Sequence, residues 1–171
     1  MAPKVLISDA LSPAAVQIFK DRGVEADVKT GLSKDELIAV IGDYDGLVVR
    51  SDTKPNKDVI AAAKNLKVIG RAGIGIDNVD VPAATRHGIV VVAAAGNDGA
   101  TAPALADPAY SPMVVAVGAS DPMGTLDPAD DTIPDWANHG TSDRPVDVVA
   151  PGVHVAGLRV PGSVIDRANP S

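Results

Sequence analysis

The chain has 171 residues, of which 46% are hydrophobic and 2% aromatic, and its formal net charge is −7 at pH 7. This length suffices for one domain with a buried core, which must be built from Ala, Val, Ile and Leu. The acidic balance excludes nucleic acid as a partner, because a phosphate backbone requires a basic patch. The absence of cysteine excludes disulfides, thiolate metal sites and cysteine nucleophiles.

The amino-terminal segment shows no targeting pattern. Its apolar run, Val5–Ile7, is soon interrupted by Asp9 and is too short for a signal peptide or a membrane span. We therefore expect a soluble, cytoplasmic protein without a membrane partner.

Residues 1–90 alternate short apolar runs with helix signals. The apolar runs predict strands at Val5–Ser8, Glu25–Val28, Gly46–Arg50, Lys67–Gly70 and Ile89–Ala94. Capping patterns and apolar spacing predict helices after Ser12-Pro13, after the capping box Ser33–Glu36, over Lys57–Leu66 and from Asp80 to Gly88. Repeated strand–helix units indicate a parallel sheet with right-handed crossovers.

The pattern changes in residues 91–171. Two further strands are predicted at Met113–Gly118 and Val146–Val149, with an extended segment at Val153–Val160. Long loops rich in Pro, Asp, Gly and Ala occupy residues 97–112 and 120–145, and no helix signal of useful length appears. Loops of this length in a compact domain usually serve a function.

Four segments carry a resemblance that covers residues 3–92. These segments are Lys4–Asp9, Asp43–Ser51, Gly70–Asp80 and Ala83–Val91. They resemble the substrate-binding domain of the D-3-phosphoglycerate dehydrogenase family, which implies a flavodoxin-like fold for this half.

The same resemblance implies an anion-binding site in which the acid's carboxylate and phosphate contact Arg50, Ser51, Arg71, Ala72, Gly73 and Ile74. The carboxyl ends of parallel strands are where open α/β sheets bind ligands, and two guanidiniums with free backbone N–H groups suit an anion. The alternative is that the loop only turns the chain while its arginines pair with surface carboxylates. Asp52 and Pro55 favour that alternative, because they add negative charge and stiffness.

Cofactor binding is not expected. Gly70, Gly73 and Gly75 run G-x-x-G-x-G, whereas a dinucleotide-binding turn needs G-x-G-x-x-G and an acidic residue for the ribose. In the dehydrogenase family the nucleotide domain and the catalytic His and Glu come later in the chain, and this sequence has no match to them.

Residues 88–171 resemble a second family, the subtilisin-like serine proteases. The segments that carry this resemblance are Val90–Gly99, Tyr110–Ala119 and Asp147–Gly152. It implies that Asn97 matches the oxyanion-hole residue, here vestigial, and that no catalytic residue remains. Gly140-Thr141-Ser142 is similar to the serine motif of that family, but it precedes Asp147–Gly152, whereas the family's motif follows the matching segment.

No metal is expected in this half. The resemblance suggests a cation site around Ala109, Met113 and Asp147, but Pro145 stands where a second carboxylate would belong.

Together these observations predict one α/β hybrid domain, 1–171, with a single three-layer, mostly parallel sheet of about seven strands. Residues 1–90 supply the flavodoxin-like or Rossmann-like units, residues 91–171 add subtilase-like strands, and the join lies in Gly88–Val92. We expect an engineered chimeric scaffold that is not an enzyme. The alternatives are a weak binder of small phosphorylated or hydroxy-acid anions, an inactive subtilase fragment, or a disordered second half. A sheet face without helices predicts self-association.

Overall fold

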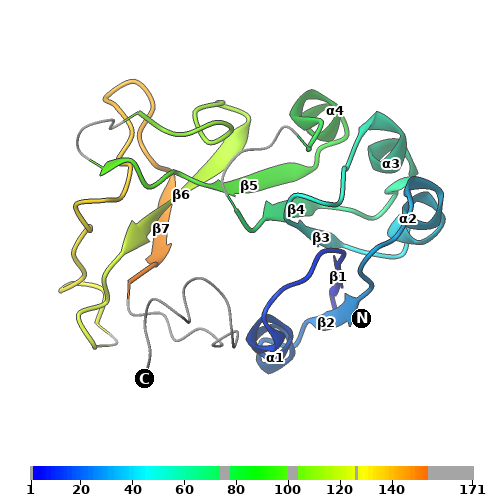
Figure 1. The fold of residues 1–171 in the computed structure, drawn as a ribbon, viewed down its shortest axis with the longest axis horizontal. Helices are drawn as coiled ribbons and strands as arrows, with labels where there is room; N and C mark the ends of the chain where they lie inside the picture. The colour runs from blue at the N-terminus through cyan, green and yellow to red at the C-terminus, as the bar shows by residue number, and fades with distance from the viewer. Residues whose placement is uncertain (1, 74–77, 100–103, 126, 154–171) are drawn as a thin grey trace, which may run out of the picture.

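The computed structural model of the chain describes residues 2–73, 78–99, 104–125 and 127–153. Its centre is one seven-stranded sheet in the order β2-β1-β3-β4-β5-β6-β7, and every neighbouring pair is parallel (Figure 1). The strands are β1 Lys4–Ile7, β2 Glu25–Val28, β3 Gly46–Val49, β4 Val68–Arg71, β5 Val90–Ala94, β6 Val114–Ser120 and β7 Val148–Pro151. The predicted fold class, strand number and parallel pairing are confirmed.

Four helices connect the first five strands, each with a side-chain cap at its start. They are α1 Pro13–Asp21, α2 Lys34–Ile41, α3 Lys57–Ala62 and α4 Val81–Arg86. Ser12, Ser33, Asn56 and Asp80 cap them, and Ser33 with Glu36 forms the predicted capping box. After α4, the described parts of the chain contain no further α-helix.

The third helix is shorter than predicted. The sequence indicated Lys57–Leu66, but α3 ends at Ala62, and Ala63 leaves helical geometry at φ −82° and ψ 66°. Ala63 and Leu66 are both buried, so the chain turns there to place these side chains in the core before β4. Tertiary packing here overrides the helix propensity of an alanine-rich run.

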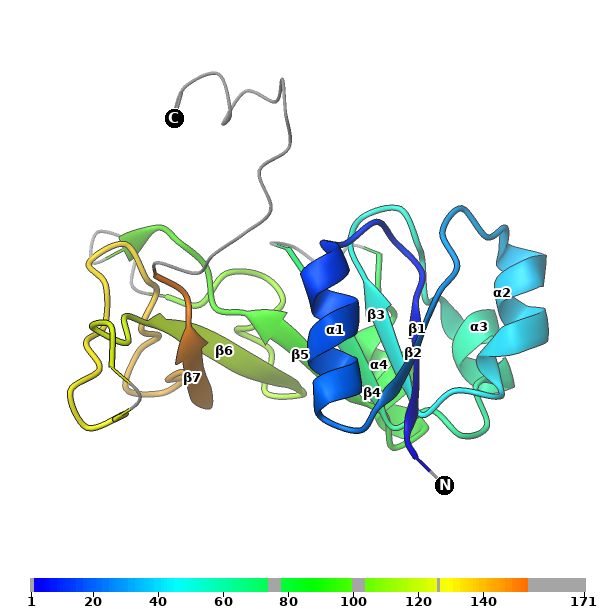
Figure 2. The ribbon, with the colours of Figure 1, turned by 90° about the horizontal axis from the view of Figure 1, so that it is seen from below.

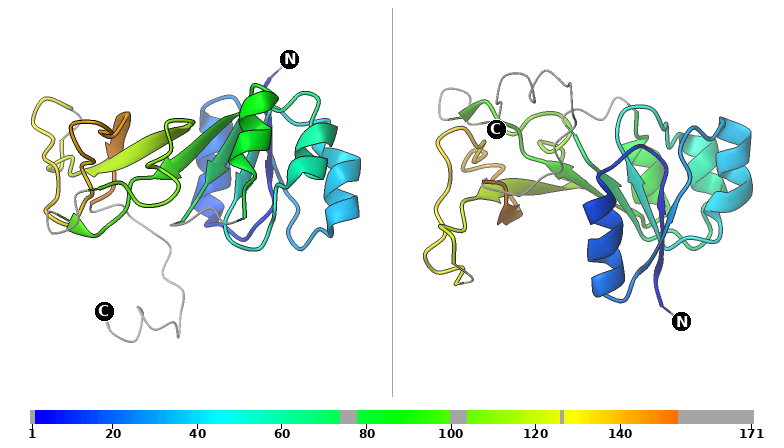
Figure 3. Two further views of the ribbon diagram at one scale, coloured as in Figure 1. Left: turned by 90° about the horizontal axis from the view of Figure 1, so that it is seen from above. Right: turned by 60° about the horizontal axis from the view of Figure 1, so that its bottom comes forward.

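The helices cover the two faces of the sheet unequally. Helices α2, α3 and α4 lie on one face and α1 on the other, as Figures 2 and 3 show. Three layers are therefore present around β1–β4. On the α4 side of β5 and β6, a loop instead supplies the packing, and Leu105 and Ala109 form a small core cluster with Ala95 and Ala116.

The other face of β4–β7 is exposed. Burial alternates along β5, where Val90 is 46% exposed and Val91 is fully buried, and Val148 on β7 is 50% exposed. None of the described helices lies over this face (Figure 3). The predicted uncovered apolar face is therefore present.

The later strands begin one or two residues after their predicted starts, and most of the predicted extended segment, from residue 154, lies outside the described residues.

Among the helices that the structure describes, none has the length and apolarity that a membrane crossing requires.

Candidate functional site

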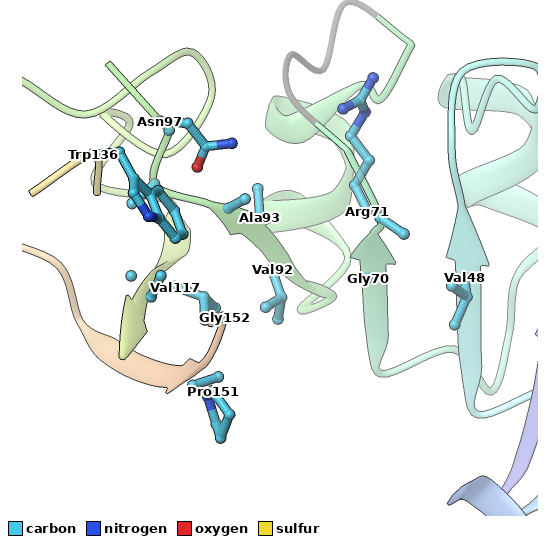
Figure 4. Close-up of a pocket in the computed structure, with 17 residues that line it drawn as sticks. Val48, Gly70, Arg71, Val92, Ala93, Asn97, Val117, Trp136, Pro151 and Gly152 are labelled. Carbon is cyan, nitrogen blue, oxygen red and sulfur yellow. The ribbon is translucent and has the colours of Figure 1, made fainter. Parts of the chain in front are cut away.

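A cavity of about 550 Å³ opens on the uncovered face of β4–β7 and extends to the carboxyl ends of these strands. Its lining comes from β3 through β7 and the loops that follow them, and includes Arg71, Val92, Asn97, Val117, Trp136 and Pro151 (Figure 4). The cavity therefore lies where an open parallel sheet is expected to bind a ligand. Arg71 is the one charged residue among its described lining residues.

Arg71 is the last residue of β4, and its guanidinium is only partly paired. Its Nε donates to Asn78 Oδ1 at 3.3 Å, whereas Nη1 is buried without a hydrogen-bond partner among the described residues. Gly73 follows with φ 151°, and a Cβ at that position would lie 2.9 Å from Arg71 Nη1. The guanidinium thus lies against its own loop and keeps an unused donor, which suits an anion.

The neighbouring loop, residues 50–53, is held by two buried polar side chains. Asp9, after β1, accepts from Arg50 N at 2.5 Å and from Thr53 N at 3.0 Å. Asn78 Nδ2 donates to the carbonyls of Arg50 and Thr53, both at 2.7 Å. The loop backbone is therefore fixed on its N–H side and on its C=O side.

The predicted anion-binding residues are only partly brought together. Arg71 and Ala72 line the cavity, and Gly73 follows them in the same loop. Arg50 and Ser51 follow β3, which pairs with β4, but both are exposed and Arg50 Nη1 donates to Ala10 O at 3.3 Å. Ser51 Oγ is 3.5 Å from Asp52 Oδ1. Ile74 lies outside the described residues.

Asn97 lines the same cavity as Arg71, a juxtaposition that the sequence did not predict. Figure 4 shows both side chains at the same rim. The buried Asn138 holds the loop that carries Asn97, because its Oδ1 accepts from Asp98 N at 2.7 Å and Gly99 N at 3.1 Å. The described lining contains neither serine nor histidine, so this part of the cavity offers no serine-protease nucleophile or base.

An arginine side chain fills the cation site suggested by the sequence. Arg144 Nη2 donates to the carbonyls of Ala109 at 2.9 Å and Val114 at 2.7 Å, and also to Asp147 Oδ2 at 3.0 Å. Hydrogen bonds from Arg144, and a further one from the Ala116 backbone, lower the pKa of Asp147.

Two glycine-containing turns lie at this edge of the sheet, where a dinucleotide would need close approach to the backbone. A Cβ on Gly96 would lie 2.6 Å from Asn138 Nδ2, and one on Gly73 would meet Arg71. The side chains of Asn138 and Arg71 therefore fill the space beside these glycines, into which a bound pyrophosphate would have to fit. The described turns do not fit a dinucleotide cofactor.

Asp9, Asn78 and Asn138 are the residues of this edge that sequence reasoning did not identify. Asp9 and Asn78 lie inside segments that were noted for their resemblance; Asp9 follows strand β1 and Asn78 precedes helix α4, whereas Asn138 lies in the long loop between β6 and β7. That pattern was the available signal. This sequence pattern indicates that a polar side chain lies near the strand ends, but it does not indicate which groups that side chain hydrogen-bonds.

Comparisons with known proteins agree with the first resemblance. The family described as "D-isomer specific 2-hydroxyacid dehydrogenase, catalytic domain" matches residues 5–117. D-3-phosphoglycerate dehydrogenase from Archaeoglobus fulgidus is 52% identical over 95 residues, which are 56% of this chain and 18% of that protein. The pig (Sus scrofa) protein of the same name is 57% identical over 89 residues, 52% of this chain and 17% of its own length. The chain thus spans less than a fifth of these relatives.

Solved structures support the same relationship. A crystal structure of a protein from Pyrococcus horikoshii OT3 has a TM-score of 0.51 and 35% identity, covering 53% of this chain and 27% of its own. The NAD⁺-bound 3-phosphoglycerate dehydrogenase of Entamoeba histolytica has a TM-score of 0.50 and 29% identity, covering 58% of this chain and 33% of its own.

These findings correct the functional prediction. Relatives that are 52–57% identical are dehydrogenases, so the predictions of a scaffold without native activity and of a chain that is not an enzyme are wrong. The error came from weighing the missing catalytic motifs above the strength of the resemblance in residues 3–92. The subtilase resemblance of residues 88–171, and with it the chimera, finds no support in the comparisons.

Proposed function

Because the chain belongs to the D-isomer specific 2-hydroxyacid dehydrogenase family, we propose that it forms the substrate-binding side of an enzyme that interconverts a D-2-hydroxy acid and the corresponding 2-oxo acid. The observation that carries this proposal is the buried Arg71 Nη1, which has no hydrogen-bond partner among the described residues at the carboxyl edge of the sheet. A carboxylate placed there would accept a charge-assisted hydrogen bond. It would also lie beside the Arg71–Gly73 loop, in which the Ala72 N–H donates to Val49 O at 2.9 Å.

The proposed substrate is an acid of the D-3-phosphoglycerate type, as the names of the relatives suggest. Arg71, Ala72, Gly73 and Ile74 would bind the carboxylate end. Arg50 and Ser51 follow the neighbouring strand and are exposed, and they would bind the phosphate end once Arg50 Nη1 leaves Ala10 O, to which it donates at 3.3 Å. Such an enzyme needs a hydride acceptor, but the described turns do not fit a dinucleotide. We therefore assign the described residues to binding and orienting the acid and not to hydride transfer.

Titration of the 171-residue chain with D-3-phosphoglycerate tests this function. Saturable binding is expected, and Arg71→Ala should weaken it roughly tenfold or more, since a hydrogen bond to a charged group contributes about 1.5–3 kcal/mol. Arg86→Ala is the matched control, because it removes the same charge from an exposed position at the end of α4. Absence of saturable binding, or equal affinities for Arg71→Ala and wild type, would contradict the proposal.

Cellular location and macromolecular partners stay predictions. We propose that the protein is cytoplasmic, and that it does not bind nucleic acid, because its net charge is −7. Fractionation of expressing cells would test the location.

A further inference from the structure

Asn78 is the side chain that connects the two loops of the candidate substrate site. Its Oδ1 accepts from Arg71 Nε at 3.3 Å, and its Nδ2 donates to the carbonyls of Arg50 and Thr53, each at 2.7 Å. The residue itself is only 7% exposed. One buried amide therefore uses its acceptor on the Arg71 loop and both its donor hydrogens on the 50–53 loop.

The opposite side of the 50–53 loop is closed by Asp9. Its carboxylate accepts from the backbone N–H groups of Arg50 and Thr53, and from Thr53 Oγ1 at 2.5 Å. Among the described residues, Asp9 contacts the 50–53 loop and makes no hydrogen bond to Arg71, so it holds that loop without positioning the Arg71 guanidinium. The bases of the two loops are already joined by the pairing of β3 with β4, in which Ala72 N donates to Val49 O at 2.9 Å. Asn78 adds the side-chain link between the 50–53 loop and the Arg71 guanidinium.

We infer that Asn78 is a positioning residue that fixes the Arg71 guanidinium relative to the 50–53 loop, and thereby selects acids with an anionic group at each end. This inference rests on the proposed function. An acid such as D-3-phosphoglycerate must reach the Arg71 loop with its carboxylate and the Arg50–Ser51 loop with its phosphate. Binding by both ends is favourable only if the two loops are already held at the matching separation.

Loss of Asn78 therefore affects one class of ligand more than another. A ligand that bridges both loops depends on their separation. D-glycerate, which lacks the phosphate, engages the Arg71 loop alone and does not depend on that separation. A residue that only supported folding would change the affinity for both ligands by the same factor.

Asn138 provides a matched control in the other half of the sheet. It is also a buried asparagine, 2% exposed, and it also holds a loop by accepting from two backbone N–H groups and donating to one carbonyl, that of Ala104 at 2.8 Å. Asn138→Ala thus creates a similar loss of buried hydrogen bonds. It leaves the Arg71 and 50–53 loops untouched.

The experiment measures the affinities of wild type, Asn78→Ala and Asn138→Ala for D-3-phosphoglycerate and for D-glycerate by calorimetry. Asn78→Ala should lower the affinity for D-3-phosphoglycerate about tenfold more than that for D-glycerate, a difference of ~1.4 kcal/mol. Asn138→Ala should change both affinities by the same small factor. If Asn78→Ala is too unstable to measure, Asn78→Ser is used in the same way, because it keeps a small polar group at the site.

The outcomes separate this inference from the function on which it rests. Equal losses for the two ligands in a folded Asn78 variant, or no loss, would overturn the positioning role while Arg71-dependent binding stands. Failure of the wild-type chain to bind D-3-phosphoglycerate overturns the proposed function, and this inference with it.

Discussion

Gly73 limits where the Arg71 guanidinium can lie. Its φ of 151° is rarely adopted by residues with a side chain, and a Cβ there would contact Arg71 Nη1. Gly73→Ala should therefore cost about 1 kcal/mol of stability through backbone strain. It should also displace the guanidinium and weaken binding of D-3-phosphoglycerate. Thermal unfolding and titration measure the two effects.

Gly23→Ala serves as the control for that substitution. Gly23 also has a positive φ, 72°, but a Cβ at this position would meet no atom within 4 Å. It should lose stability without losing affinity. Unchanged affinity in Gly73→Ala would show that the guanidinium does not act where we place it.

The buried polar residues show what could be predicted at this scale. Arg71 was identified from its place after a strand and from the family resemblance. Asn78 and Asp9 were not, because the backbone groups of the 50–53 loop that they bind lie 25 to 44 positions away in the chain. No local pattern specifies which distant carbonyl or N–H a buried amide or carboxylate will bind.

Arg144 acts at the scale of elements, since it ties the loop before β6 to the segment before β7. Its guanidinium bonds the carbonyls of Ala109, Ser111 and Val114 and the carboxylate of Asp147. Arg144→Ala should destabilise the chain by about 2 kcal/mol, because several oxygens lose a charged donor. Added Ca²⁺ should restore part of this loss, since the freed oxygens suit a hard cation. Chemical denaturation with and without Ca²⁺ measures both effects.

The difference between wild type and Arg144→Ala should also depend on pH. The pKa of Asp147 is lowered in the folded state, chiefly by Arg144, so the pair contributes stability above the ordinary carboxyl pKa. That contribution is lost as the pH falls through the lowered pKa. A stability difference that stays constant down to strongly acidic pH would contradict this account.

Helix starts were easier to predict than helix ends. Ser33 and Glu36 marked α2 because a capping box is a local arrangement of four residues. The end of α3 at Ala62 was missed because it depends on burying Ala63 and Leu66 against the rest of the core. Local signals therefore predicted the existence and order of the elements, and packing decided where one of them stops.

At the scale of the whole molecule, the exposed face of β4–β7 predicts association between copies of the chain. Val90 and Val148 lie on this face and are 46% and 50% exposed. Light scattering over a concentration series should show self-association that Val90→Glu with Val148→Glu reduces, because charges oppose burial of that face. Val28→Glu is the control, since Val28 is 53% exposed but lies on β2, at the far edge of the sheet. A monomer at all concentrations would contradict this prediction.

The sequence by itself determined the α/β class, the order of the elements and the relationship to the dehydrogenases. These depend on apolar runs, caps and motifs that are contiguous in the chain. Only the tertiary structure decided that Arg71 and Asn97 line one cavity, that Arg144 bonds the carbonyls of Ala109 and Val114 and the carboxylate of Asp147, and that Asn78 links Arg71 to the 50–53 loop. The physical reason is that each of these depends on strand register and on hydrogen bonds between residues far apart in sequence, and such contacts exist only once the sheet has assembled.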